Sequence, residues 1–204
     1  MEALILVDIQ HDFLPGGALE VAQGDAIIPV ANQLQEHFDL VVATQDWHPA
    51  DHGSFASNHP GKQPFEQAEL AGLPQVLWPD HCLQGSPGAG FPETLNMNKV
   101  EAIFRKGMDP RIDSYSGFFD NGHKKATGLG DYLKGRNVDT IYVVGLAGDY
   151  CVNFTLLDAL ELGFKAVLIQ DGTKPIDEEG FQKALASFKG KGGQVISSRE
   201  IVHV

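Results

Sequence analysis

The chain has 204 residues, of which 43% are hydrophobic and 21% are charged, as in globular domains that bury a core without disulfide support. A formal net charge of −12 argues against a nucleic-acid-binding protein, because such proteins usually present a basic face. Two cysteines are too few for a disulfide scaffold and favour a reducing compartment. No basic leader and no membrane-length apolar run occur. We therefore expect a cytoplasmic protein that binds neither nucleic acid nor membranes.

The predicted elements alternate between strand and helix along the chain. Short apolar runs indicate buried strands at residues 3–7, 40–44, 102–105, 140–144, 166–170 and 194–197. Helical spacing of apolar residues predicts a first helix capped by Asp25, then helices over 127–134 and 152–162 and one around 181–188. Such alternation is typical of a parallel sheet covered by helices on both faces. We predict one α/β domain spanning residues 1–204.

Residues 45–98 interrupt this alternation. They are rich in Pro, Gly, His and Asp and show little periodicity. An irregular insertion of this length in a compact domain is usually functional. Because it leaves from the carboxyl end of the second predicted strand, where open α/β sheets bind ligands, we expect it to cover the site.

Four side chains capable of chemistry stand at the ends of predicted strands: Asp8, Asp46, Lys106 and Cys151. Cys151 is predicted in the first turn of a helix, where free N–H groups favour a thiolate and can hold an oxyanion. Asp8 could accept the thiol proton, and Lys106 could stabilise the thiolate and orient the carboxylate. The structural alternatives are a buried cysteine, a turn aspartate and a salt-bridged lysine.

A second group of polar residues lies in the insertion. Asp46 and His48 are two residues apart, so in an extended backbone their side chains point the same way. His52, His59 and His81 follow. Carboxylate and imidazole ligands suit a divalent transition metal such as Zn, Fe or Mn, and three protein ligands leave positions open for water or substrate. The alternative is that these are solvated loop histidines.

Aromatic residues surround the same positions. Phe13 and Trp78 lie in predicted loops beside the candidate groups, where they could hold a flat ring between them. Tyr115 is a further aromatic residue expected around the candidate groups, whereas Phe104, Phe118 and Phe164 are expected in the core.

Six motifs occur together in a fixed order. They are Val7-Asp8-Ile9-Gln10 with Asp12-Phe13 and Gly16-Gly17, Gln45-Asp46-Trp47-His48-Pro49 with His52-Gly53-Ser54-Phe55, Trp78-Pro79-Asp80-His81-Cys82, Arg105-Lys106-Gly107, Asp113-Ser114-Tyr115-Ser116-Gly117-Phe118 and Asp149-Tyr150-Cys151-Val152. On these motifs the chain resembles the nicotinamidases of the isochorismatase-like cysteine hydrolase superfamily over essentially its whole length.

The resemblance implies a three-layer α/β/α fold with a six-stranded parallel sheet. It implies hydrolysis of nicotinamide, and of pyrazinamide, to the acid and ammonia through a cysteine thioester, in NAD salvage. Asp8, Lys106 and Cys151 would form the catalytic triad. The N–H groups of Ala147 and Cys151 would form the oxyanion hole, helped by a cis peptide between Leu146 and Ala147.

The resemblance also implies one divalent metal ion, zinc first and iron or manganese as alternatives. Asp46, His48 and His81 would hold it, with His52 as an additional or substitute ligand. The substrate would contact Phe13, Trp78, Tyr115 and Tyr150.

One residue departs from the pattern of the family. Its members usually have the sequence Ala-Thr-Asp, then one further residue, then the cysteine. Here Gly148 stands in place of the threonine. Because glycine adds backbone freedom, we expect a less rigid oxyanion hole. A related hydrolase acting on another small amide or ureido compound, or a module that binds metal or ligand without catalysis, is the alternative. The sequence leaves monomer and homo-oligomer equally open.

Overall fold

The computed structural model describes residues 1–202 and has a six-stranded parallel sheet at its centre. The strand order is β5-β2-β1-β6-β7-β8, and every pair of neighbours runs parallel. The strands are β1 (Glu2–Val7), β2 (Val41–Asp46), β5 (Val100–Lys106), β6 (Thr140–Gly145), β7 (Lys165–Thr173) and β8 (Gln194–Ile196). All six strands that the sequence predicts are present, with ends that shift by at most three residues.

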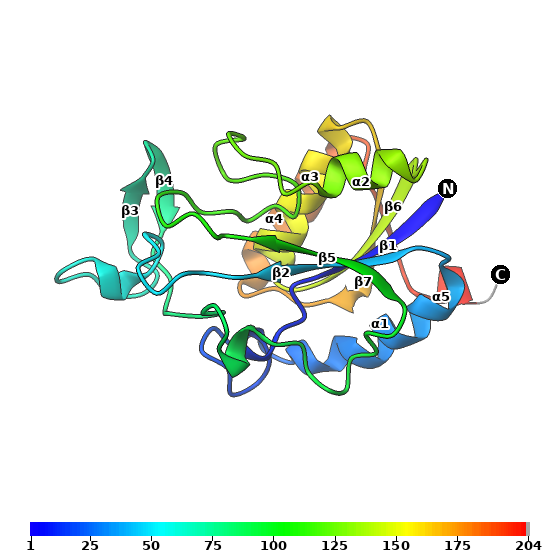
Figure 1. Ribbon diagram of the computed structural model, residues 1–204. Coiled ribbons are helices and arrows are strands. Elements are labelled where there is room, and N and C mark those ends of the chain that lie inside the picture. The colour runs from blue at the N-terminus through cyan, green and yellow to red at the C-terminus, as the bar shows by residue number, and fades with distance from the viewer. Residues whose placement is uncertain (203–204) are drawn as a thin grey trace.

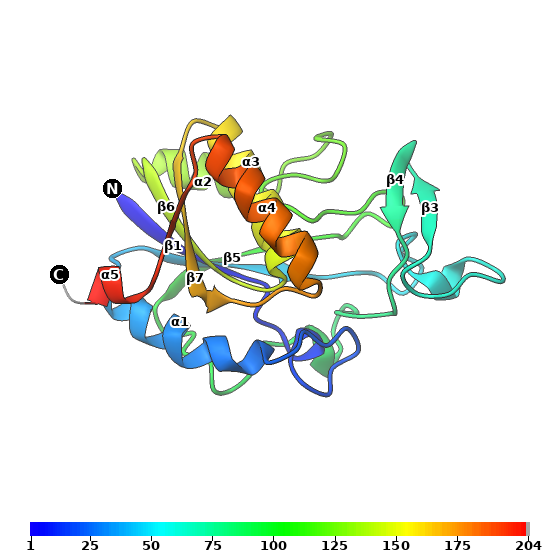
Figure 2. The ribbon, with the colours of Figure 1, turned by 180° about the vertical axis from the view of Figure 1, so that it is seen from behind.

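Helices cover both faces of the sheet (Figures 1 and 2). Helices α1 (Ile28–Leu34) and α5 (Arg199–Val202) lie on one face, and α2 (Leu129–Gly135), α3 (Asn153–Glu161) and α4 (Glu178–Gly190) lie on the other. Strand β1 contributes side chains to the cores on both faces of the sheet, because alternate residues of a strand point to opposite faces. Leu4 and Leu6 join the core on the α1 side, whereas Ala3, Ile5 and Val7 join the other core. The α/β/α prediction is confirmed.

The starts of two helices differ from the prediction. Asp25 does not cap the first helix, because it lies inside a 3-10 turn, Gly24–Ile27, that precedes α1. The helix predicted over 152–162 begins as a π-helical turn, Gly148–Val152, before α3. Single π turns of this kind often occur at functional sites. Helix α5 was not predicted at all.

The aromatic core predictions hold for two of three residues. Phe118 and Phe164 are buried, but Phe104 lies half-buried on the edge strand β5 and packs against the core from outside.

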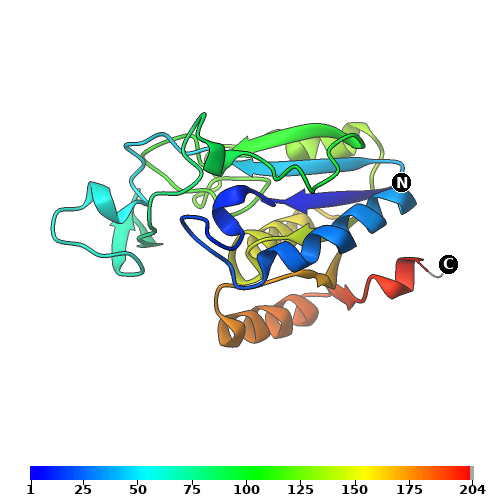
Figure 3. The same ribbon diagram turned by 90° about the horizontal axis from the view of Figure 1, so that it is seen from below.

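The segment between β2 and β5 is more ordered than its composition predicts. It contains an antiparallel hairpin, β3 (Gln67–Leu70) and β4 (Leu73–Val76), as well as 3-10 turns at Ala56–Asn58 and Pro87–Ala89. Ala71 and Gly72 form the hairpin turn with φ of 56° and 80°, and alanine rarely occupies such a position. The hairpin lies beyond the carboxyl ends of the sheet strands, as Figures 1 and 3 show. Within residues 1–202, no helix combines the length and apolar character needed to cross a membrane.

Two isoleucines in the same sheet test how burial sets stability. Ile5 in β1 is fully buried, whereas Ile103 in the edge strand β5 is 48% exposed. We expect Ile5→Ala to lower the free energy of unfolding by about 2–5 kcal/mol, because it leaves a cavity. Ile103→Ala should cost below about 1 kcal/mol. Urea denaturation of both variants measures the difference, and equal losses would contradict this account of the core.

Candidate active site

Four neighbouring strands deliver the four predicted side chains to one edge of the sheet. Asp46 and Lys106 are the last residues of β2 and β5, and Asp8 directly follows β1. Cys151 lies in the π turn that follows β6. Because β5, β2, β1 and β6 are adjacent and parallel, their carboxyl ends place these groups side by side.

Lys106 lies at the centre of the cluster, with its side chain fully buried. Its Nζ lies 2.5 Å from Asp46 Oδ1, 2.8 Å from Asp8 Oδ2, 3.0 Å from the carbonyl oxygen of Ser114 and 3.4 Å from Cys151 Sγ. Burial by itself would lower the pKa of Lys106, but the two carboxylates raise it well above its usual range. The side chain is therefore a permanent ammonium that donates hydrogen bonds to Asp46, the Ser114 carbonyl and Cys151 and forms an ion pair with Asp8.

Asp8 has the properties of a base. Burial raises the pKa of its carboxyl group, against the opposing effect of Lys106. Thr44 Oγ1 donates a hydrogen bond to Oδ1 at 2.6 Å, whereas Oδ2 accepts no well-aligned hydrogen bond from the described residues. Carboxylate oxygens of Asp8 and Asp46 and the Cys151 sulfur lie within 4.8 Å of one another. Oδ2 is thus ion-paired with Lys106 but keeps a lone pair that can take a proton.

Cys151 does not have the low thiol pKa that a helix start suggests. It is 6% exposed, and burial raises the pKa of its thiol well above the usual range, outweighing the stabilising effect of Lys106. The nearby Asp8 and Asp46 carboxylates raise it further. The resting group is therefore a thiol, and attack requires a partner that removes its proton.

The turn before Cys151 has the expected backbone. The peptide between Leu146 and Ala147 is cis, as predicted. The Ala147 carbonyl accepts hydrogen bonds from the N–H groups of Tyr150 and Val152, which closes the turn over the end of β6. Ala147 and Cys151 both line the same pocket.

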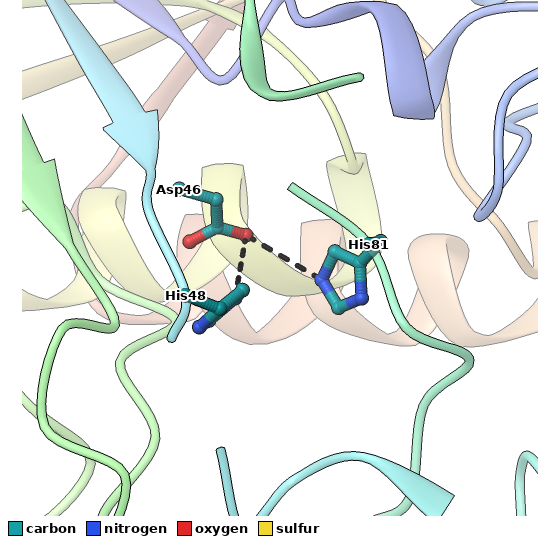
Figure 4. A group of neighbouring side chains, drawn as sticks. All are labelled: Asp46, His48 and His81. Carbon is teal, nitrogen blue, oxygen red and sulfur yellow. Dashed lines mark ion pairs between the residues drawn. The ribbon is translucent and has the colours of Figure 1, made fainter. Parts of the chain in front are cut away.

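Asp46, His48 and His81 form the predicted cluster of metal-ligand type (Figure 4). Asp46 Oδ2 lies 3.5 Å from His48 Nε2 and 3.7 Å from His81 Nε2. Each histidine places Nδ1 at 2.8 Å from a backbone carbonyl, of Gly107 and Pro79 respectively. These bonds fix Nδ1 as the donor and leave both Nε2 lone pairs facing Asp46, as in protein metal sites.

His52 lies beside this cluster, with its ring centroid 4.4 Å from that of His48. Burial lowers the pKa of His52 to about 4, so the imidazole is neutral. Its Nδ1 lies 2.7 Å from Ser54 Oγ, and its buried Nε2 has no partner among the described residues. An orphaned buried nitrogen is costly unless an ion or water meets it, so the donor set fits a bound divalent ion.

The pocket beside the sulfur is lined by the four predicted substrate-contacting residues Phe13, Trp78, Tyr115 and Tyr150. Its wall includes a network that the sequence did not reveal. Gln75 Nε2 lies 3.0 Å from both Tyr115 OH and Asp113 Oδ2, and Trp78 Nε1 donates to Tyr115 OH at 3.3 Å. Gln75 comes from strand β4, where a single buried glutamine in a four-residue strand leaves no recognisable pattern.

The comparisons with known proteins agree with this architecture. The family model of the isochorismatase domain matches residues 2–200. The chain belongs to the isochorismatase family. It is 51% identical over 179 residues to a nicotinamidase of Escherichia coli K12, with 86% of this chain and 84% of that protein covered.

Two solved structures place the chain within this family's fold. A nicotinamidase/pyrazinamidase of Acinetobacter baumanii is 50% identical, with a TM-score of 0.96 over 98% of this chain and 97% of that chain. A pyrazinamidase of Pyrococcus horikoshii, solved in complex with zinc, is 38% identical, with a TM-score of 0.80 over 96% and 98% of the two chains.

Thr44 tests the state of Asp8. Its hydrogen bond stabilises the ionised carboxylate and so lowers the pKa of Asp8; removing it in Thr44→Val should raise that pKa. Because the base must be ionised to act, the acid limb of the pH profile of kcat/KM should move up by about one unit.

Thr140→Val is the matched control, because Thr140 donates a similar bond to Asp139 at the opposite end of the sheet. Its profile should equal that of the unaltered chain. An acid limb that stays in place or moves down in Thr44→Val, at unchanged metal content, would remove Asp8 as the titrating base.

Proposed function

We propose that the chain hydrolyses nicotinamide to nicotinate and ammonia, and pyrazinamide in the same way, as a step of NAD salvage. The observation that carries this is one pocket lined by Cys151 and by the donor set Asp46, His48 and His81, with the Asp8 carboxylate next to the sulfur. Its aromatic walls suit a flat pyridine or pyrazine ring. The near 50% identity to nicotinamidases supports the same substrate.

The first half of the reaction forms a thioester. Asp8 takes the proton of Cys151 as the sulfur attacks the carboxamide carbon. The oxygen of the tetrahedral intermediate accepts hydrogen bonds from the N–H groups of Ala147 and Cys151. Asp8 then returns the proton to the leaving nitrogen, the C–N bond breaks and ammonia departs.

The second half releases the acid. Asp8 takes a proton from a water molecule, the hydroxide attacks the thioester carbon, and the C–S bond breaks to give nicotinate. The sulfur recovers its proton from Asp8. Throughout, Lys106 keeps its proton and holds the carboxylate and the sulfur in register, through contacts of 2.8 and 3.4 Å.

Asp46, His48 and His81 would hold a divalent ion, with His52 as the further ligand. When bound, the ion supplies a Lewis-acid position for the ring nitrogen of the substrate. Phe13 and Trp78 would hold the ring between them. Zinc is our assignment, supported by the histidine-rich donor set and by the zinc-bound pyrazinamidase relative.

We place the reaction in the cytoplasm. Both cysteines are free, and the mechanism requires Cys151 as a thiol, which a reducing compartment preserves.

The two buried cysteines give a matched test of the nucleophile. Cys151→Ala should lower ammonia release from nicotinamide by about 10⁴-fold or more, because no other sulfur reaches the substrate. Cys82→Ala should remain active, since Cys82 is buried in the core on the α1 side. Coupled ammonia assays with metal analysis of both proteins measure this. Nicotinamide turnover by Cys151→Ala would overturn the assignment.

Two histidines test the metal site in the same way. His81→Ala should lose most of the bound zinc and its nicotinamide turnover, because it removes one of three ligands. His59→Ala should keep both, since His59 Nε2 lies 2.8 Å from the Gly53 carbonyl and His59 belongs to no metal-ligand group among the described residues. Zinc per chain is measured by mass spectrometry, and a chelator should reproduce the His81→Ala defect. Unchanged zinc content in His81→Ala would refute the ligand set.

A further inference from the structure

Gly148 lies in the π turn that carries Cys151, and two side chains from other elements press against its backbone. A Cβ built on Gly148 would lie 2.8 Å from a ring carbon of Phe181 and 2.9 Å from the methyl group of Thr173. Carbon atoms in packed proteins stay about 3.5–4.0 Å apart. The Phe181 ring therefore occupies the volume that a side chain at position 148 would take.

Phe181 is held firmly in this place. It is 4% exposed and lies in the first turns of α4, directly after the capping contact of Asp177 Oδ2 with the N–H of Gly180 at 2.7 Å. The N–H of Phe181 donates to the Asp177 carbonyl at 2.9 Å. The ring thus belongs to a capped and buried helix start and not to a mobile loop.

The same connection fastens the turn by hydrogen bonds. The N–H of Gly148 donates to the Lys174 carbonyl at 2.8 Å. The carboxylate of Asp149 accepts from the N–H groups of Ile176 and Asp177, each at 2.9 Å. The segment between β7 and α4 therefore fastens the turn whose residues Ala147 and Cys151 line the pocket.

We propose that Phe181 is a positioning residue for the oxyanion hole: its ring fills the space beside Gly148 and holds the turn that carries the Ala147 and Cys151 N–H groups. This rests on the proposed function. Phe181 does not line the pocket beside Cys151 but lies with Gly148 at a separate small cavity. Donors in such a hole stabilise the tetrahedral state more than the bound amide, so their displacement lowers kcat and leaves KM nearly unchanged.

Adding a methyl group at position 148 tests the packing directly. Gly148 does not have a positive φ, so Gly148→Ala meets no backbone restriction and acts through its contacts with Phe181 and Thr173. We expect it to lower kcat for nicotinamide at least tenfold, with KM within twofold. Phe181→Leu alone should cost threefold or less. In the double variant, where the smaller side chain admits the methyl group, kcat should rise at least threefold above that of Gly148→Ala.

Phe188→Leu is the matched control. Phe188 is 1% exposed in the same helix, but its ring lies against Gly193. Combined with Gly148→Ala, it should restore no activity. A merely structural role of Phe181 would change the melting temperatures of the variants without this selective recovery of kcat.

A reversible inhibitor gives a second readout. Pyridine-3-carbaldehyde can add to the Cys151 thiol: Asp8 takes the thiol proton as the S–H bond breaks, the S–C bond forms, the C=O π pair moves to oxygen, and the adduct oxygen meets the oxyanion hole. Its affinity should fall in Gly148→Ala by about the same factor as kcat, whereas the affinity for nicotinate should change less than twofold.

The outcomes separate the two proposals. Absence of ammonia release by the unaltered chain, loaded with zinc, would refute the proposed function. An active chain in which Gly148→Ala keeps its kcat and aldehyde affinity, or in which Phe181→Leu and Phe188→Leu restore activity equally, would refute the role of Phe181.

Discussion

The site depends on one buried cation. Lys106 is removed from water and must be paired, since an unpaired charge at such a position costs several kcal/mol. It finds carboxylates at the ends of β1 and β2 because strand β5, which carries it, is the neighbour of β2 in the sheet. The strand order thus brings both carboxylates to the Lys106 ammonium. The ammonium in turn holds Asp8 and Cys151 in place.

Asp46 joins the nucleophile to the metal-ligand cluster. Its Oδ1 accepts from Lys106, while its Oδ2 faces His48 and His81. Burial would raise the pKa of Asp46, but the Lys106 ammonium brings it well below its usual range, so it remains ionised for both partners. Gln10 fixes its backbone through hydrogen bonds to both the N–H and the carbonyl of Asp46. The catalytic group around Lys106 and the metal-ligand cluster therefore form one connected polar network. A shift of Asp46 would disturb both.

Much of this arrangement could be predicted from the sequence, because apolar runs mark buried parallel strands and polar residues at their ends meet at one edge. The convergence of Asp8, Asp46 and Lys106 follows from that rule. The contacts of Thr44 and Gln75 do not, since a buried threonine in an apolar strand and a glutamine in a short hairpin have no distinctive pattern. The raised pKa of the Cys151 thiol does not follow either, because desolvation depends on the tertiary surroundings and outweighs the local effect of a helix start.

Gly148 shows why local propensity is insufficient at such a site. Taken alone, a glycine beside the nucleophile predicts a loose turn, because it lacks the side chain that restricts the backbone. In the folded chain, the vacant volume is filled from α4 by Phe181 and from β7 by Thr173, and the backbone is bonded to the β7–α4 connection. Rigidity at the turn is therefore supplied by packing between elements that are distant in sequence. A small residue in an active site is loose only where no neighbouring element occupies its space.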